Sequence, residues 1–425
     1  MKKKLVLLVI GYFIALNVSA QLVAQRKLDS LLNILDSKGM IKGSIAVSIN
    51  GKQLTKKAFG ASTQTLYRIG SVTKLFTTVL IFKLVEEKRL SLDDILYKFF
   101  PDLPNAKKIK IRDLLYHRSG LHDYTKDTQF ENWKNQTKTS EELLTIIRSK
   151  SPDFEPDSKA DYSNSNFLIL GWIVEKLSQS TYAYFLKKKI TQPLKMNHTY
   201  FGSEASGLDT LSSYSYVNGK WKTEPASNLE LHGGAGAILS TPEDLLIFMD
   251  GLNSGKLIQK SNWNSMQIIL EEYGMGVFAN KYGTSPGFGH NGRIEEFYSA
   301  LWYYPKDKLI LAVCLNGIYY PRVDLIEEIL KSCTGISFAF PFSEDLSLPD
   351  SCLGNYSSGN LKLTCAKDST NMVIQIQGQD ILLDPVRRNY FMNKKMGYFF
   401  EFFPDKGEIK VKEKDNVYLF RKLTY

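Results

Sequence analysis

One Ser-x-x-Lys motif, Ser71-Val-Thr-Lys74, opens the long apolar run from Leu75 to Val85. Residues three apart on a helix share a face, so Lys74 would lie within reach of the Ser71 hydroxyl. A serine hydroxyl is a weak nucleophile until a base takes its proton, and a lysine becomes that base when burial lowers its pKa. The motif therefore predicts a nucleophile and its base at the start of a helix. Alone, it also fits a capping serine followed by a surface lysine.

Two Tyr-x-Asn sequences offer further proton-handling groups. Tyr216-Val-Asn-Gly219 has the residues of a hairpin turn, so we interpret it as structural. Tyr162-Ser-Asn164 lies in a polar loop just before an apolar helix over 167–177, and a rigid helix would hold catalytic groups on such a loop. The structural alternative is that Asn164 or Ser165 only caps that helix.

A third segment, Gly289-His290-Asn291-Gly292, leads into an expected strand pair. Glycine at such a place lets the backbone approach a ligand closely, although an ordinary turn before a strand would also use it. A nucleophile needs both a second proton-handling group and a substrate-orienting group. The three segments together supply candidates for all of these roles.

In this order, the motifs resemble those of the penicillin-recognising serine hydrolases. The nearest branch contains class C β-lactamases, D-alanyl-D-alanine carboxypeptidases, esterases and D-aminopeptidases. The resemblance runs from about Gly43 to Lys331 and includes the stretches 67–74, 111–121, 233–244 and 288–292. Because several ordered stretches match, the resemblance is far more specific than any single motif.

The resemblance assigns a role to each matching residue. Ser71 would attack a carbonyl and form an acyl-enzyme, while Lys74 and Tyr162 share the proton transfers; which of the two is the base stays open. Asn164 would hold Lys74 or the substrate amide. His290 would assist the proton relay or meet a substrate carboxylate.

The backbone N–H groups of Ser71 and Arg293, the residue after Gly292, would form the oxyanion hole. The resemblance implies neither a metal ion nor a cofactor. None of the four cysteines has metal-ligand spacing, and the five histidines are scattered along the sequence.

Two departures from the family pattern bear on the substrate. His290 stands where dedicated β-lactamases have lysine, and a neutral imidazole is a weaker partner for a β-lactam carboxylate. Glu295-Glu296 stands where many relatives have a small residue, which could favour an amine-bearing substrate. We interpret this pair first as solvated surface charge.

The resemblance implies an α+β sandwich, a β-lactamase/transpeptidase-like domain in which helices flank an antiparallel sheet. The residue pattern agrees, with an Asn50-Gly51 hairpin over 44–59, two long strands over 287–316 and helices between them. After Pro349, short strands separated by turns predict a small all-β barrel or sandwich, similar to the lipocalin-like domains of some relatives. We expect a hydrolase domain over 21–340, a proline-rich linker and a C-terminal β domain over 350–425.

The first 20 residues have the pattern of a secretory signal peptide: Lys2 to Lys4, a short apolar core and small residues up to Ala20. We expect cleavage after Ala20, a secreted or periplasmic location and no transmembrane anchor after processing. Export permits disulfides, and Cys352 with Cys365 is the expected pair. Cys314 lies in an apolar strand and fits a buried thiol.

The formal net charge of +10 is spread along the sequence without a long basic block, so we expect no nucleic-acid partner. The expected function is an exported serine hydrolase that cleaves amide or ester bonds through a Ser71 acyl-enzyme, as a D-amino-acid peptidase, carboxypeptidase or esterase. Its partner would be a small-molecule or peptide substrate, with cell-wall-derived compounds among the candidates. One alternative is a β-lactamase, and another is a silent receptor for peptidoglycan fragments or peptides.

Overall fold

The computed structural model describes residues 21–205, 211–342, 350–368 and 371–423. The chain divides into two compact units, one made of residues 43–213 and 224–316 and the other of residues 1–42, 214–223 and 317–425. The expected signal peptide lies outside the described residues, as does most of the expected linker. The expected domain boundaries stay a prediction.

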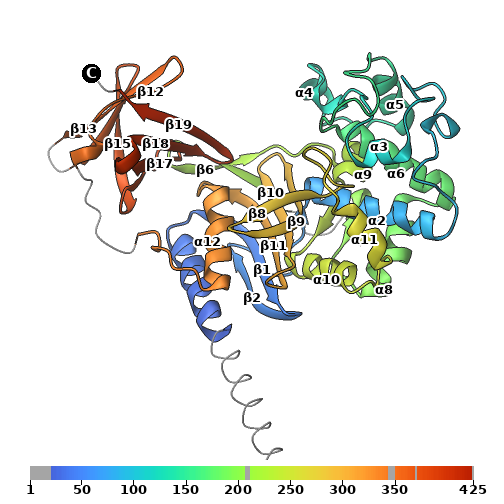
Figure 1. Cartoon of the computed structure of the whole chain (residues 1–425), viewed down its shortest axis with the longest axis horizontal. Helices are drawn as coiled ribbons and strands as arrows, with labels where there is room; N and C mark the ends of the chain where they lie inside the picture. The colour runs from blue at the N-terminus through green and yellow to red at the C-terminus, as the bar shows by residue number, and fades with distance from the viewer. Residues whose placement is uncertain (1–20, 206–210, 343–349, 369–370, 424–425) are drawn as a thin grey trace, which may run out of the picture. The chain divides into compact units, whose positions relative to one another are not determined.

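The first unit, residues 43–213 and 224–316, has a mixed α/β architecture. Its sheet has the strand order β2-β1-β11-β10-β9-β8, and the pairs β1–β2, β8–β9, β9–β10 and β10–β11 are antiparallel (Figure 1). These strands are β1 (Ile41–Ile49), β2 (Lys52–Phe59), β8 (Phe278–Tyr282), β9 (Ser285–Ile294), β10 (Phe297–Tyr304) and β11 (Leu309–Ile318). The hairpin between β1 and β2 turns at Asn50 and Gly51, both with positive φ, as predicted.

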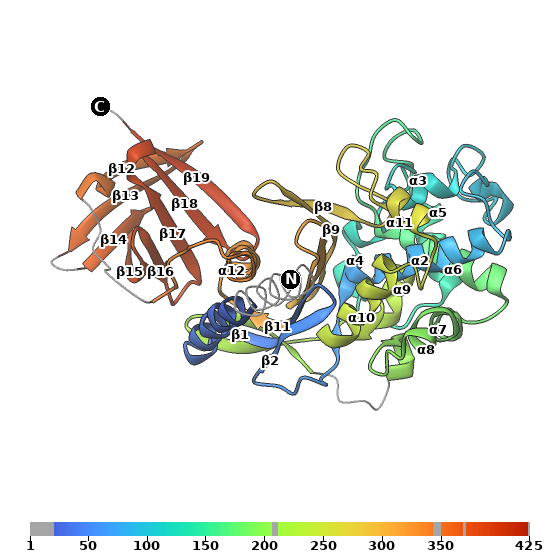
Figure 2. The ribbon, with the colours of Figure 1, turned by 60° about the horizontal axis from the view of Figure 1, so that its bottom comes forward.

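The helices gather on one side of this sheet in both ribbon views (Figures 1 and 2). The main ones are α2 (Thr73–Glu86), α3 (Ile111–Leu115), α5 (Ser140–Arg148), α6 (Asn164–Ser178), α7 (Tyr182–Leu186), α9 (Gly233–Gly236) and α10 (Pro242–Asn253). Helices α2 and α6 are buried on nearly every face, so both must lie inside the protein. The Phe76 ring of α2 stacks on the Phe248 ring of α10, with centroids 3.9 Å apart.

The prediction of two strands over 287–316 was wrong in one respect. The first of them is broken by a tight turn at Glu295 and Glu296, so that β9 and β10 form a hairpin that precedes β11. Glu295 has φ +47°, a conformation that glutamate adopts far less readily than glycine or asparagine. The turn therefore has no signal in the sequence.

The C-terminal strands close into an eight-stranded barrel, which decides between the expected barrel and sandwich. In chain order they are β12 (Gly354–Ser358), β13 (Leu361–Asp368), β14 (Asn371–Ile376), β15 (Gln379–Arg387), β16 (Tyr390–Asn393), β17 (Tyr398–Phe403), β18 (Glu408–Glu413) and β19 (Asn416–Lys422). The expected disulfide between Cys352 and Cys365 is not formed. Both residues are free thiols in the barrel core. Cys314 is buried on β11, as predicted.

A buried ionic network links helix α12 (Arg322–Thr334) to the barrel within the second unit. Asp324 of α12 accepts a hydrogen bond from Lys412 of β18 at 2.6 Å, and Glu328 pairs with Arg387 of β15. Burial raises the pKa of Glu328 to about 7, while Arg387 opposes this shift. Such buried pairs are costly to break, so α12 and the barrel are expected to unfold together.

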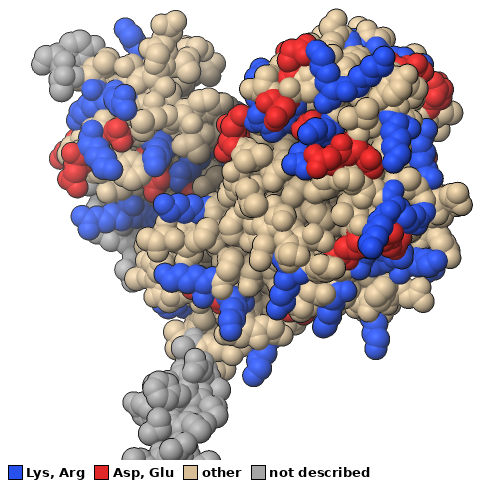
Figure 3. Space-filling view, turned by 45° about the vertical axis from the view of Figure 1, so that its right-hand side comes forward, with Lys and Arg blue, Asp and Glu red and all other residues tan. Residues whose placement is uncertain are grey.

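Within the described residues, each helix is too short or too polar to cross a bilayer. On the face drawn in Figure 3, acidic side chains accompany the basic ones over the upper part, whereas the lower rim is mostly basic.

Candidate active site

Ser71 lies at the centre of a group of buried polar side chains. It belongs to the short 3₁₀ helix Gly70–Val72, which runs directly into α2. Its hydroxyl does not cap the helix. Instead it accepts hydrogen bonds from Lys74 Nζ at 3.1 Å and from the Tyr162 hydroxyl at 2.7 Å. The capping alternative is therefore wrong.

Lys74 has no solvent exposure, and its Nζ donates three hydrogen bonds. The acceptors are Ser71 Oγ, Asn164 Oδ1 at 2.9 Å and the Ala235 carbonyl at 2.9 Å. Burial lowers the pKa of Lys74 to about 7, and the negative charge of Asp123 limits the shift. At neutral pH a substantial fraction of Lys74 is therefore the free amine, which can accept a proton.

Tyr162 completes the contacts to the serine. Its ring lies beside the Lys74 ammonium, with Nζ 4.8 Å from the ring centroid. Burial raises the pKa of the Tyr162 phenol, so it stays protonated at neutral pH. A protonated phenol can donate a proton but does not readily accept one, so Tyr162 fits the role of acid rather than base.

Asn164 is the first residue of α6, but its side chain does not cap the helix. Its Nδ2 donates to Asp123 Oδ2 at 3.1 Å and to Thr125 Oγ1 at 3.0 Å, while its Oδ1 faces Lys74. The carboxylate of Asp123 only accepts hydrogen bonds, so it fixes which end of the amide points at Lys74. Asp123 was absent from the sequence-based site.

His117 is a second group that the sequence analysis did not include. Its ring lies 4.5 Å from the Tyr162 ring between centroids, and its Nδ1 accepts the backbone N–H of Ser163 at 3.2 Å. Burial, together with the Lys74 charge, lowers the pKa of His117 well below its usual value. The neutral imidazole thus positions the Tyr162-Ser-Asn164 segment.

His290 of β9 is buried and stacks on the Phe278 ring, with centroids 4.1 Å apart. Its Nδ1 contacts the Asn291 carbonyl, which can only accept, so Nδ1 carries the proton. Nε2 is then an acceptor, for which the described residues offer no partner. Burial first, and then the charge of Lys74, lowers the pKa of His290 to about 3. A neutral ring with an acceptor at Nε2 does not suit a substrate carboxylate.

Strand β9 packs closely against the chain just before Ser71. A Cβ atom at Gly292 would lie 2.0 Å from the Ile69 carbonyl oxygen, so only glycine fits there. Ser299 of β10 donates to the same carbonyl at 2.6 Å. A Cβ atom at Gly70, where φ is +49°, would meet the backbone N of Arg293 at 2.9 Å. These contacts bring the two expected oxyanion donors, Ser71 and Arg293, onto neighbouring segments.

Gly292→Ala should therefore damage both stability and activity. The methyl group would push β9 away from Ile69, and overpacking of this kind costs about 1–3 kcal/mol of unfolding free energy. Thermal melts and ester hydrolysis would measure the two effects. Gly219→Ala is a matched control, because its Cβ would meet nothing within 4 Å and only backbone strain at φ +78° remains. Equal behaviour of the two variants would contradict this role for Gly292.

Glu295 is not the solvated charge that we expected. Its carboxylate lies 3.6 Å from the Arg68 guanidinium and accepts the backbone N–H of Ser227 at 2.9 Å. Arg68 also donates to the Ser227 carbonyl at 2.8 Å. Arg68 and Glu295 thus hold the loop around Ser227 next to the end of β9. Tyr216, which we interpreted as structural, belongs together with Tyr319 to the unit that lacks Ser71, and the two rings stack there.

A serine hydroxyl that accepts hydrogen bonds from a buried lysine and a tyrosine is the arrangement of an activated acyl-transfer nucleophile. A family model described as Beta-lactamase matches residues 23–331, and the chain belongs to this family. It is a serine hydrolase of that family.

Known relatives agree with this assignment. The chain is 27% identical over 322 residues to a teichoic acid D-alanine hydrolase of Staphylococcus aureus, covering 72% of this chain and 78% of the relative. A D-stereospecific amidohydrolase from Streptomyces sp. is 26% identical with a TM-score of 0.63, covering 75% of this chain and 99% of that one. An octameric penicillin-binding protein homologue from Pyrococcus abyssi, 23% identical with a TM-score of 0.67, covers 93% of this chain and 99% of its own, and shares the fold.

Proposed function

We propose that this protein is an exported hydrolase that removes D-aminoacyl groups held in ester or amide linkage, through an acyl-enzyme on Ser71. The observation that carries the proposal is the hydrogen-bonded group of Ser71, Lys74 and Tyr162, with Lys74 fully buried. Asn164 holds Lys74, and the backbone N–H groups of Ser71 and Arg293 stabilise the oxyanion.

The proton route follows from the two pKa shifts. The free amine of Lys74 accepts the Ser71 proton as Oγ attacks the carbonyl carbon, because its pKa lies at about 7. Tyr162, whose pKa is raised, remains a phenol and passes a proton to the leaving alcohol or amine. The proton that Lys74 took from Ser71 then restores the Tyr162 phenol, and water hydrolyses the acyl-enzyme, which returns a proton to Ser71 Oγ.

The pH profile tests this route. Since the base must be deprotonated, kcat/KM should fall about tenfold per pH unit below about 7 and level off above it. Stopped-flow or steady-state hydrolysis of a non-ionising p-nitrophenyl ester would measure the profile. Asp123→Asn removes the charge that holds the pKa of Lys74 up, so the acid limb should move to lower pH. A flat wild-type profile between about pH 5 and pH 8 would contradict Lys74 as the base.

Two observations support a D-aminoacyl substrate. The relatives at 26–27% identity are a D-stereospecific amidohydrolase and a teichoic acid D-alanine hydrolase. His290 offers a neutral acceptor where a β-lactam carboxylate would need a cation. An ammonium or N–H group on the substrate fits that acceptor better than an anion does.

A panel of substrates would separate the candidates. D-alanyl and L-alanyl p-nitrophenyl esters test stereochemistry, D-Ala-D-Ala peptides test carboxypeptidase activity, and nitrocefin tests β-lactamase activity. We expect the D-alanyl ester to have the highest kcat/KM. A higher value for nitrocefin would favour the β-lactamase alternative, and no turnover of any substrate would favour the silent receptor.

Export is the remaining part of the proposal and rests on the sequence of residues 1–20. Expression of the full chain with its own N-terminus, followed by N-terminal sequencing of the secreted protein, would test it. A mature protein that begins at Gln21 is expected. One that still begins at Met1 would refute cleavage.

A further inference from the structure

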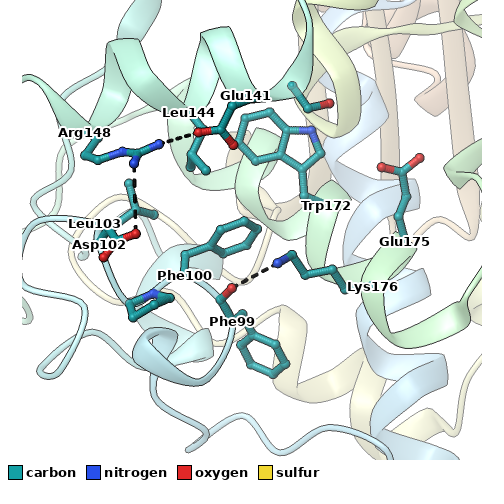
Figure 4. A pocket seen from close by; sticks show the side chains of 12 residues that line it. Phe99, Phe100, Asp102, Leu103, Glu141, Leu144, Arg148, Trp172, Glu175 and Lys176 are labelled. Carbon is teal, nitrogen blue, oxygen red and sulfur yellow. Dashed lines mark hydrogen bonds and ion pairs between the residues drawn. The ribbon is translucent and has the colours of Figure 1, made fainter.

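Two adjoining cavities lie along helices α5 and α6, outside the candidate active site. Their volumes are about 370 Å³ and about 570 Å³, and Ser140, Trp172 and Glu175 line both of them. Because these three residues border both cavities, we consider the two together as one candidate groove, and Figure 4 shows the smaller cavity. Trp172 follows Asn164 by eight residues on α6, so it lies about 12 Å further along the helix axis.

The floor of the smaller cavity is aromatic and apolar. The rings of Phe100 and Trp172 meet at a tilt of 54° with centroids 6.1 Å apart, and Leu144 adds an aliphatic wall. Lys176 crosses this floor with Nζ 4.4 Å from the Phe100 centroid and donates to the Phe99 carbonyl at 3.2 Å (Figure 4). The floor can therefore receive a flat, weakly polar face.

The rim of the groove mixes hydrogen-bond donors with acceptors. Arg148 Nη2 contacts Glu141 at 2.6 Å and Arg148 Nη1 lies 4.0 Å from Asp102, while its buried Nε has no partner in the described part of the chain. Among the described residues, no hydrogen-bond partner is found for the indole N–H of Trp172. The larger cavity adds hydroxyl groups and carboxylates, supplied by Thr137, Thr139, Thr181, Glu204 and Glu230.

These features select a ligand class. Five carboxylates and three cations line the groove, which disfavours a polyanion: Asp102, Glu141, Glu175, Glu204 and Glu230 against Lys138, Arg148 and Lys176. A sugar ring has an apolar C–H face and a rim of hydroxyls, each of which both donates and accepts. We propose that this groove binds a neutral glycan chain, with one sugar ring packed on Trp172. The proposal is independent of the proposed function.

Binding of two oligosaccharides to the full protein tests the proposal. Chitotetraose, a tetramer of β-1,4-linked N-acetylglucosamine, and maltotetraose would be titrated by calorimetry and tryptophan fluorescence. Saturable binding of chitotetraose alone would identify a glycan with N-acetyl groups, and binding of both would identify a general glycan site. A poly(glycerol phosphate) probe forms the third arm, and preference for it over both sugars would overturn the proposal.

Substitutions locate the binding. Trp172→Ala should weaken sugar binding at least about tenfold, whereas Trp172→Phe keeps the aromatic floor and should lose less. Trp221→Phe, outside the groove, is the fluorescence control. The thermal midpoint of each variant should match that of the wild type, which shows that the variant is folded. Trp172→Phe should also hydrolyse p-nitrophenyl esters at the wild-type rate. Absence of saturable binding by wild type, or unchanged binding by folded Trp172→Ala, would overturn the proposal.

Discussion

Replacing Ser71 with alanine is expected to lower kcat/KM for ester or amide hydrolysis by at least about 10⁴-fold. Lys74 and Tyr162 both donate hydrogen bonds to this hydroxyl, at 3.1 Å and 2.7 Å, so its loss leaves no nucleophile between them. Rates with a D-alanyl p-nitrophenyl ester would be compared with those of the wild type. A loss smaller than about tenfold would show that another group attacks the substrate.

A double variant tests whether Ser71 and Tyr162 act in the same proton route. Residues that act as one unit give strongly non-additive losses. Ser71→Ala combined with Tyr162→Phe should therefore be hardly slower than Ser71→Ala alone. Thermal melts would show that each variant is folded. Fully additive losses would contradict a shared proton route through Ser71.

Lys74→Ala is expected to produce the second largest loss, about 10²–10⁴-fold in kcat/KM, because general-base catalysis contributes that much. The substitution removes the base and leaves Asn164 and the Ala235 carbonyl without their donor. Lys74→Arg should not restore activity, since a guanidinium does not give up its proton at neutral pH. The measurement is again kcat/KM, together with the thermal midpoint.

Lys83→Ala provides the matched control on the same helix. Lys83 lies in the last turn of α2, nine residues after Lys74 and so about 13.5 Å further along the helix axis. Its replacement should leave hydrolysis almost unchanged. Equal losses for Lys83→Ala and Lys74→Ala would mean that helix α2, rather than the Lys74 amine, limits the reaction.

The sequence predicted the candidate site where chemistry and spacing coincide. Ser71 and Lys74 are three residues apart, and Tyr162 and Asn164 precede an apolar helix, so local pattern is enough to select them. Asp123 and His117 carry no such pattern. Each acts through a contact formed between distant segments, Asp123 on the Asn164 amide and His117 on the Ser163 backbone.

For the fold, too, the sequence predicted the features that depend on local pattern and missed those that depend on distant contacts. Apolar runs and the Asn50-Gly51 turn predict strands and helices because their signals are local. The turn at Glu295 was missed since it is held by Arg68 and the Ser227 backbone, which are far away in the sequence. Short strands alone do not show whether a β domain closes, because closure depends on pairing between the first and last strands, β12 and β19.

Covalent labelling shows directly whether Ser71 is the nucleophile. The full protein would be treated with a fluorophosphonate, and in parallel with benzylpenicillin, and its intact mass measured before peptide mapping. We predict one fluorophosphonate adduct per chain, located on Ser71, with labelling lost in Ser71→Ala and slowed in Lys74→Ala. An unlabelled wild type, or an adduct that persists in Ser71→Ala, would contradict it.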